Sequence, residues 1–391
     1  MESPRWKKLL NELKDANRED HLTIVKSRAN ARALAGALAL DVDLPYAIAF
    51  SHPRDKRITF KEDTHEYFLD GKLLPITVTG FYMRYFQEFD ARGTVNQYAE
   101  RWRQNKYHKW NPLLAAMAAL GVSEERQKEA VLLGWKLNGA TQSSIGTAMH
   151  RTIELSLNGR EEPELVEREN EVAAVVETGH ELQKLLEDPE TYNLGGNPQA
   201  CRLVSSWILS EQPSNQPSEE DFRFPALSGG TRFDAKEFAY FAQWRADNGN
   251  LLAVRQEMNV WSEELQLAGQ LDALFCDTAD DLAYVLVDWK RSKELKKEGF
   301  RNQCGTGPFN KIPDSNVGHY YVQVNMYAEL LRRHYGIHVK RMLLVQLHPD
   351  LPSYRELEVP CLTAEVNLSF AEREQELESD RLASHVELLH K

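Results

Sequence analysis

Apolar residues along the chain fall into two kinds of pattern, and each kind predicts its own element of secondary structure. Three apolar runs in close order predict strands over Leu252–Trp261, Leu267–Cys276 and Leu282–Lys290. Helical patterns stand on both sides of them, near Ala235–Trp244 and from Tyr320 onward. Strands flanked by helices in this order predict an α/β fold with a mixed central sheet.

The N-terminal part of the chain has a different pattern. Residues 1–50 are expected to be helical, and so are most of residues 81–137. Between them, alternating apolar residues surround Asp70-Gly71, which is the strongest short signal for a β-hairpin. This predicts a helical extension with a β-hairpin before the sheet.

The remaining elements follow from capping residues and composition. Ser143-Ser144 predict the start of a helix that ends at Asn158-Gly159. An acidic helix is expected over 161–186, and a loop rich in Ser, Pro and Gly over 210–230. After the helix that begins at Tyr320, we expect a strand, a short strand and a final charged helix.

The length of 391 residues predicts two domains, or one domain with large insertions. The changes of pattern suggest an N-terminal helical segment (1–56), a β-hairpin and helical region (57–140) and a core (141–391). A hydrophobic fraction of 42% with 27% charged residues is typical of a globular protein. The net charge of −12 disfavours nonspecific coating of nucleic acid, although a local basic groove is compatible with it.

The cysteine pattern and the hydropathy of the chain indicate the cellular compartment in which the protein is expected. The four cysteines form no CxxC pair, which argues against a zinc finger or a disulfide framework and fits a reducing environment. No apolar run approaches the ~18 residues of a membrane span, and the N-terminus lacks the apolar segment of a secretory signal. We therefore expect an intracellular protein without a membrane partner.

Charged residues stand where the predicted strands end. Because strand side chains alternate between faces, Asp288 and Lys290 should point one way and Trp289 the other. Asp272 interrupts the preceding apolar run, where a lone carboxylate is costly unless it is paired or binds a metal. Two carboxylates on adjacent strands suit Mg²⁺ or Mn²⁺, and a nearby lysine suits charge that develops on phosphate. The alternative is a structural salt bridge to Lys290.

This constellation resembles the signature of the PD-(D/E)XK nuclease superfamily, with Asp272 followed by Asp288-Trp289-Lys290. "GTAMHRTIE" resembles a helix motif of its RecB-type branch, with His150 as the motif histidine. Gln323-x-x-x-Tyr327 resembles a second helix motif, and Glu257 stands where many members carry a glutamate.

The resemblance covers about residues 146–349 and extends to particular relatives. The tripeptide Asp288-Trp289-Lys290 is similar to the corresponding motif of mitochondrial genome maintenance exonucleases. The later loop and helix are similar to those of nuclease-like proteins of large DNA viruses. The resemblance to this superfamily implies a restriction-endonuclease-like core. Several relatives hold an iron–sulfur cluster, but this chain has no cysteine before Cys201 and only Cys361 late. We therefore expect no cluster.

The resemblance also implies the metal ligands. Asp272 and Asp288 would hold Mg²⁺ or Mn²⁺ with the backbone carbonyl of Trp289. His150 would be a further ligand or would orient water, although a buried core histidine is the alternative. An imidazole ligand tilts the preference toward Mn²⁺. Glu257 is a further candidate acid, with a surface salt bridge as the alternative.

The remaining implied roles concern catalysis. Lys290 would position the attacking water and stabilise charge on the phosphate. Gln323 would hold the lysine or the water, and Tyr327 would pack or touch the nucleic-acid backbone, since the two lie four apart on one helix face. Plain helix packing is the alternative for both.

Two basic segments could contact DNA. Arg291 and Lys293 lie in the basic run 290–301, for which a solvated charged helix is the alternative. Trp102, Arg103 and Tyr107 lie in a segment where aromatic and basic residues alternate, as in proteins that bind single strands. Part of these aromatic residues must belong to the core.

Together these features predict a Mg²⁺- or Mn²⁺-dependent deoxyribonuclease. An exonuclease on single-stranded or end-containing DNA is preferred, acting in replication, repair or recombination with partner proteins of those processes. A structure-specific endonuclease is one alternative. The other is a DNA-binding protein that keeps the nuclease fold without cutting.

Overall fold

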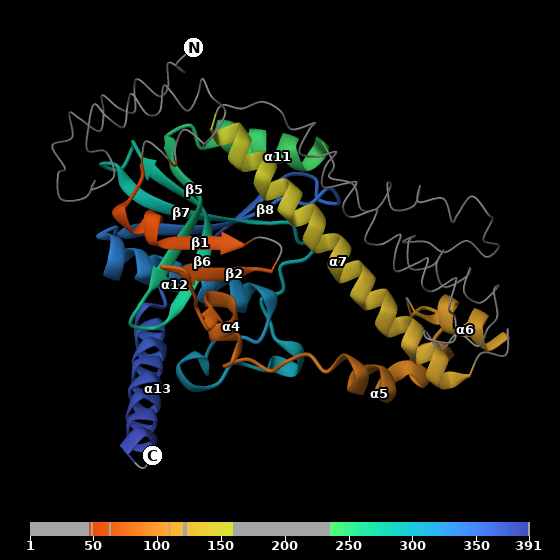
Figure 1. Cartoon of the computed structure of the whole chain (residues 1–391). Helices are drawn as coiled ribbons and strands as arrows, with labels where there is room; N and C mark the ends of the chain where they lie inside the picture. The colour runs from red at the N-terminus through yellow and green to blue at the C-terminus, as the bar shows by residue number, and fades with distance from the viewer. Residues whose placement is uncertain are drawn as a thin grey trace. The chain divides into compact units, whose positions relative to one another are not determined.

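The computed structural model describes residues 47, 50–61, 64–108, 110–119, 123–158 and 235–389 (Figure 1). The predicted helices before residue 47, the acidic helix over 161–186 and the loop over 210–230 lie outside the described residues. Within the part of the chain that is described, no helix is both long and apolar enough to cross a membrane.

Contacts divide the chain into two compact units. Among the described residues, the first unit comprises 50–88, 154–158 and 239–389, and we call it the sheet unit. The second comprises 89–153 and 235–238. The three-part division expected from the sequence stays a prediction.

The sheet unit is built on a mixed sheet (Figure 1). Its strands are β4 (Ile76–Thr77), β5 (Leu251–Ser262), β6 (Leu267–Asp277), β7 (Ala283–Lys290), β8 (Val339–Gln346) and β9 (Arg355–Glu358). Strands β5, β6 and β7 pair antiparallel, β7 and β8 pair parallel, and β9 closes the edge antiparallel to β8. The predicted fold class is confirmed, since a mixed sheet flanked by helices is consistent with a restriction-endonuclease-like core.

The three central strands begin and end within one residue of the sequence prediction. They are easy to find because almost every residue in them is buried, so the apolar runs are nearly continuous. The parallel connection from β7 to β8 needs a crossover, and helix α12 (Asn316–Tyr335) provides it. Ser315 caps its start, and Gly336 ends it in the left-handed conformation with φ of 67°.

The two faces of β7 are covered differently. Trp289 packs on one face against Phe241 and Trp244 of α11 (Ala235–Asp247), with ring centroids 5.5 and 4.9 Å apart. On the other face Lys290 lies beside Tyr320 of α12. The predicted alternation of side chains along this strand is therefore confirmed.

The predicted hairpin is also present. Strands β1 (Ile58–Lys61), β2 (Glu66–Leu69) and β3 (Lys72–Leu73) form a separate antiparallel sheet. Asp70 and Gly71 make the two-residue turn with φ of 50° and 79°, as a type I′ turn requires.

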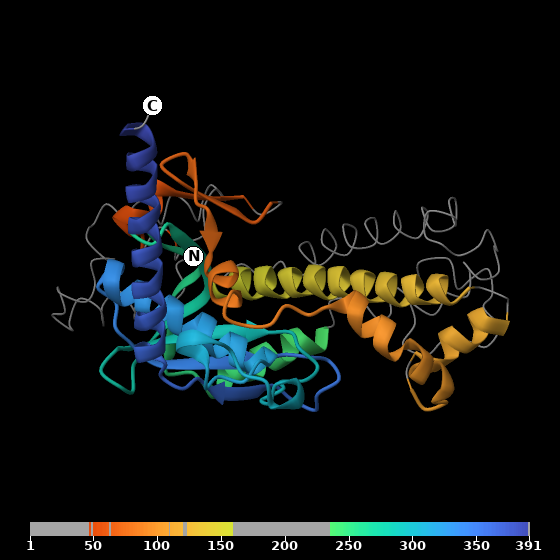
Figure 2. The same cartoon turned by 90° about the horizontal axis from the view of Figure 1, so that it is seen from below.

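Helix α7 (Glu124–Leu157) corrects one prediction. It is unbroken in Figures 1 and 2, so the expected start at Ser143-Ser144 is wrong, whereas the expected end at Asn158 is confirmed. Serine favours a helix start but does not force one when the residues before it continue the helix. The predicted boundary between residues 140 and 141 therefore falls inside a helix.

The remaining helices are short or lie at the end of the chain. They are α4 (Val78–Met83), α5 (Ala91–Gln104), α6 (Asn111–Ala119) and α13 (Thr363–Leu389). Helix α13 starts beside α4, where Phe370 meets Phe81, and its later turns project away from the sheet as a straight rod (Figure 2).

Close packing fixes α12 against the sheet. Gly269 of β6 lies under the ring of Tyr327, and a Cβ at this position would be 2.7 Å from Tyr327 Cε1 and 2.9 Å from Val78 Cγ2. Only glycine leaves space for the edge of this ring and for Val78, so α4 and α12 can both pack closely against β6.

Gly269→Ala is expected to destabilise the protein by about 1–3 kcal/mol, because the added methyl group overpacks a buried contact. Urea denaturation followed by tryptophan fluorescence measures this change. Gly249→Ala is the matched control, because its Cβ meets nothing closer than 3.6 Å. Equal midpoints for the two variants would contradict the packing described here.

Candidate metal and catalytic site

The site begins where β6 and β7 separate. Their last paired residues are Ala273 and Val287, and the register places Asp272 level with Asp288 just beyond them. There the Oδ2 atom of Asp272 accepts a hydrogen bond of 2.7 Å from the backbone N–H of Trp289. A side-chain carboxylate thus takes the place of a backbone acceptor, and the two strand ends open around it.

Lys290 and Asp288 form an ion pair next to this opening. The Lys290 Nζ atom lies 2.8 Å from Asp288 Oδ2, and the two side chains are 16% and 3% exposed. Burial alone would lower the pKa of Lys290, but the carboxylates of Asp288 and Asp272 outweigh it and raise the pKa above its ordinary value. The lysine is therefore charged at neutral pH. The pair by itself also fits the alternative of a structural salt bridge.

Glu257 brings a further carboxylate to Asp272. The β5–β6 register, which pairs Gln256 with Ala273 and Met258 with Leu271, places Glu257 level with Asp272. Glu257 has a φ of 44°, a left-handed conformation that is uncommon for a residue other than glycine inside a strand. Such strain gathers at functional sites, and here it lies beside a second acid.

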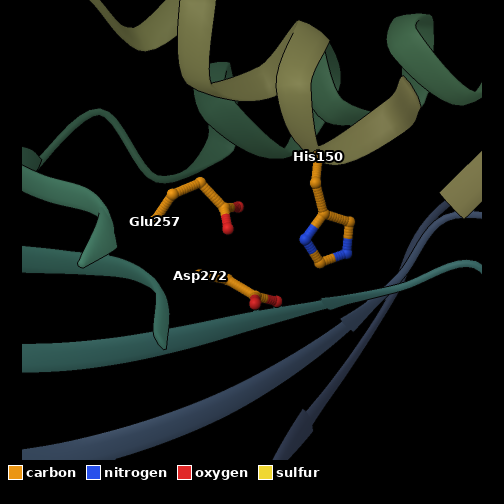
Figure 3. A group of neighbouring side chains, drawn as sticks. All are labelled: His150, Glu257 and Asp272. Atoms are coloured by element: carbon orange, nitrogen blue, oxygen red, sulfur yellow. The ribbon is translucent and has the colours of Figure 1, made fainter. Parts of the chain in front are cut away.

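His150 completes this group from the last turns of α7. Its ligand nitrogen and the carboxylate oxygens of Glu257 and Asp272 all lie within 4.8 Å of one another. Figure 3 shows the three side chains pointing toward a common space. Just past the end of the same helix, Asn158 of the sheet unit is hydrogen-bonded at 2.9 Å to Gln256, the neighbour of Glu257.

The donor set fits a divalent cation. Ligands at ~2.1 Å from an ion stand about 3.0–4.2 Å apart, so a small contraction would let all three reach it. Two carboxylates level with each other on neighbouring strands repel unless a positive charge lies between them. One imidazole with two carboxylates suits Mn²⁺ and Mg²⁺, with the nitrogen favouring Mn²⁺.

The structure does not bring every expected ligand into this group. His150, Glu257 and Asp272 converge, but the oxygens of Asp288 lie outside the group and one of them meets Lys290. For Trp289 the structure gives the amide contact to Asp272. The roles of Asp288 and of the Trp289 carbonyl as metal ligands stay predictions.

Helix α12 supplies a residue that the sequence motifs did not single out. The ammonium of Lys290 lies 4.5 Å from the centroid of the Tyr320 ring, so the ring and Asp288 hold the lysine from two sides. Tyr320 is three residues before Gln323 and shares its helix face, which is the signal that could have revealed it.

The motif residues Gln323 and Tyr327 are linked to each other. Gln323 Nε2 donates to the Tyr327 hydroxyl at 3.2 Å and lies 3.4 Å from Thr79 Oγ1. Tyr327 is only 4% exposed, and burial raises the pKa of its hydroxyl. Its ring packs against Gly269, as the packing alternative expects, and a contact of Tyr327 with nucleic acid stays a prediction.

The basic segment after β7 is a loop. Residues 291–299 contain no helix, so the alternative of a solvated charged helix is wrong. Lys293 is exposed and lies 2.6 Å from Asp350, and Arg291 is half-buried. Both lie within three residues of Lys290, and their contact with DNA stays a prediction.

The aromatic and basic residues of the second unit differ in exposure. Trp102 stacks on His108 with ring centroids 5.0 Å apart, and Tyr107 is 84% exposed. Arg103 pairs with Glu100 and with Glu124, the latter at 2.9 Å, so a phosphate would have to compete with these acids. Of the three predicted contact residues, Tyr107 is the one whose side chain is displayed to solvent.

Comparison with known proteins agrees with this geometry. The family model of the PD-(D/E)XK nuclease superfamily matches residues 122–389, which is more than half of the chain. The chain belongs to the PD-(D/E)XK nuclease superfamily. A search of curated proteins found no match. The predicted superfamily is confirmed, and the RecB-type branch stays a prediction.

Mn²⁺ is expected to raise the melting temperature of the wild-type protein, because an ion that binds only the folded state stabilises it by about 2.7 kcal/mol at 100 times its Kd. Asp272→Asn and Glu257→Gln should each remove most of this effect. Differential scanning calorimetry with and without Mn²⁺ measures it.

Glu378→Gln is the matched control for these variants, because it removes one exposed carboxylate on α13. Its response to Mn²⁺ should equal that of the wild type. If Asp272→Asn and Glu257→Gln keep the full stabilisation by Mn²⁺, the three side chains do not form a metal site.

Proposed function

We propose that the protein is a metal-dependent deoxyribonuclease that hydrolyses phosphodiester bonds as an exonuclease on single-stranded or end-containing DNA. Membership of the superfamily supports hydrolysis of a nucleic acid. The preference for an exonuclease rests on the motifs that resemble the RecB-type branch. The observation that supports the proposal most is the arrangement of Asp272, Asp288 and Lys290 where strands β6 and β7 separate. Glu257 and His150 converge on Asp272 at the same place.

The residues divide into two groups with different tasks. Asp272, Glu257 and His150 would hold a divalent ion, with Asp288 beside them. When bound, such an ion supplies Lewis acidity, which withdraws charge from the phosphate and lowers the pKa of water. Lys290 holds its positive charge beside Asp288, where it can orient water and stabilise the charge that develops on the phosphate.

Asp288 keeps Lys290 charged and in place. A buried ammonium without a partner would lose its proton, and the contact of 2.8 Å prevents this. The ring of Tyr320 lies 4.5 Å from the same ammonium and adds a second attractive contact. The lysine is thereby oriented before substrate binds, which reduces the reorganisation needed during the reaction.

Lys290→Ala is expected to reduce cutting of end-labelled linear DNA by about 10²–10³-fold, the usual cost of removing one group that stabilises developing charge. The assay compares single-stranded, double-stranded and circular DNA, and a matched RNA, with Mg²⁺ or Mn²⁺. Lys72→Ala, which removes an exposed lysine of β3, is the control for a simple loss of charge.

Each result of this assay points to one activity. Cutting of linear but not circular DNA supports the exonuclease, and cutting of circles supports a structure-specific endonuclease instead. DNA binding without cutting under either metal ion would replace the enzyme by a DNA-binding protein with a nuclease fold. Preference for the RNA would change the substrate but keep the site.

Tyr320→Leu is expected to lower kcat by about 2- to 30-fold, because the ring face that attracts Lys290 is lost, while Tyr320→Phe should stay close to wild type. Steady-state kinetics on the best DNA substrate separate kcat from KM. A defect in Tyr320→Phe as large as in Tyr320→Leu would show that the hydroxyl group, and not the ring, matters.

A further inference from the structure

An aromatic ring is displayed to solvent in the loop that follows Lys290. Phe300 is 66% exposed, and the guanidinium carbon of its neighbour Arg301 lies 5.1 Å from the centroid of the ring. Moving a large apolar side chain out of water lowers the free energy. An exposed ring is therefore suited to bind a ligand with an apolar face.

The turn that carries the ring is strained. Arg301 and Asn302 are consecutive residues with φ of 54° and 59°, in the left-handed region that glycine normally occupies. Hydrogen bonds from Asn302 N–H to the Gly299 carbonyl at 3.0 Å and from Gln303 N–H to the Phe300 carbonyl at 3.1 Å close the turn. This backbone directs the side chains of Phe300 and Arg301 outward.

Contacts within the sheet unit brace the turn. The Asp314 N–H donates to the Gln303 carbonyl at 2.8 Å, and Gln303 Nε2 donates to Gln87 Oε1 at 2.9 Å. Gly299 is buried so tightly that a Cβ would lie 2.2 Å from the Gln303 carbonyl oxygen. The base of the turn is therefore closely packed and hydrogen-bonded beneath the exposed ring.

The same loop is anchored to the elements that carry the site. It leaves β7 at Lys290, and the Gln346 side chain at the end of β8 donates to the Ser292 carbonyl. Further along, the Lys296 N–H donates to Asn316 Oδ1 at the start of α12 at 2.8 Å. Lys296, Lys297 and Arg301 are exposed cations of the same loop and its turn.

We propose that Phe300 and Arg301 form a stacking site for one nucleobase of the DNA strand that enters the site. This inference rests on the proposed function, since it assigns a contact for that substrate. A base presents a flat π-face to the ring and to the guanidinium plane, whereas the flanking lysines attract its phosphates. The base can belong to a single strand or to the last pair of a duplex, because both present the same face.

The test measures binding without cutting, with Lys290→Ala as the common background. Phe300→Ala and Phe300→Trp are added to it, and Leu368→Ala is the control because it removes another exposed apolar side chain, on α13. The probes are a single-stranded oligonucleotide and a blunt duplex, each carrying 2-aminopurine at successive positions. Fluorescence anisotropy gives Kd, and quenching of 2-aminopurine reports stacking.

Phe300→Ala is expected to weaken binding about tenfold, which is the loss typical of one base stack, and to abolish quenching at one position. Phe300→Trp should retain both. A loss with the single strand alone assigns the base to a strand, and a loss with the duplex alone assigns it to a terminal pair.

The inference is overturned if Phe300→Ala binds and quenches as Leu368→Ala does while the protein with Lys290 intact cuts DNA. In that case the proposed function stands without the stacking site. If the protein with Lys290 intact neither cuts nor binds DNA, the proposed function fails and the stacking site fails with it.

Discussion

The hydrogen bond from the Trp289 amide to the Asp272 carboxylate is the interaction on which the site depends. Where β6 and β7 stop pairing, a buried backbone N–H would be left without an acceptor, and an unsatisfied donor of this kind is costly. Asp272 supplies the acceptor, so the strands can separate without that cost. The separation leaves room beside the Asp272 carboxylate, where His150 and Glu257 converge. The same carboxylate thus maintains the local fold and belongs to the candidate metal group.

The strand that carries Asp288 and Lys290 is held firmly from its other face. Trp289 packs between the rings of Phe241, Trp244 and Phe275, which fixes the height and rotation of β7. Because neighbouring side chains on a strand point in opposite directions, a rigid Trp289 also fixes the directions of Asp288 and Lys290. The order acid, large aromatic, lysine therefore combines an anchor with two oriented charges, and this explains how the end of a buried strand can carry both.

Much of the core could be predicted from the sequence because it follows from simple periods. The strands are continuous apolar runs, the hairpin follows from Asp70-Gly71, and Asp272 is conspicuous as an acid in an apolar strand. The unbroken helix through Ser143-Ser144 could not be predicted, because a local capping preference competes with the stability of the surrounding helix. The left-handed φ of Glu257 and the position of the Tyr320 ring also escaped prediction, since both arise from contacts between distant segments.

The ion pair between Lys290 and Asp288 is compatible with both a structural and a catalytic role of the lysine. A buried lysine needs a carboxylate to remain charged, and a catalytic lysine needs to remain charged to act on phosphate. What distinguishes this pair from a plain salt bridge is its surroundings: Asp272 has a separate amide partner, and two further ligand side chains meet that acid. A structural bridge would require one acid for one lysine. Here Glu257 and Asp272 are level with each other beside Asp288, and a group of three acids is a donor set that a divalent cation can bind.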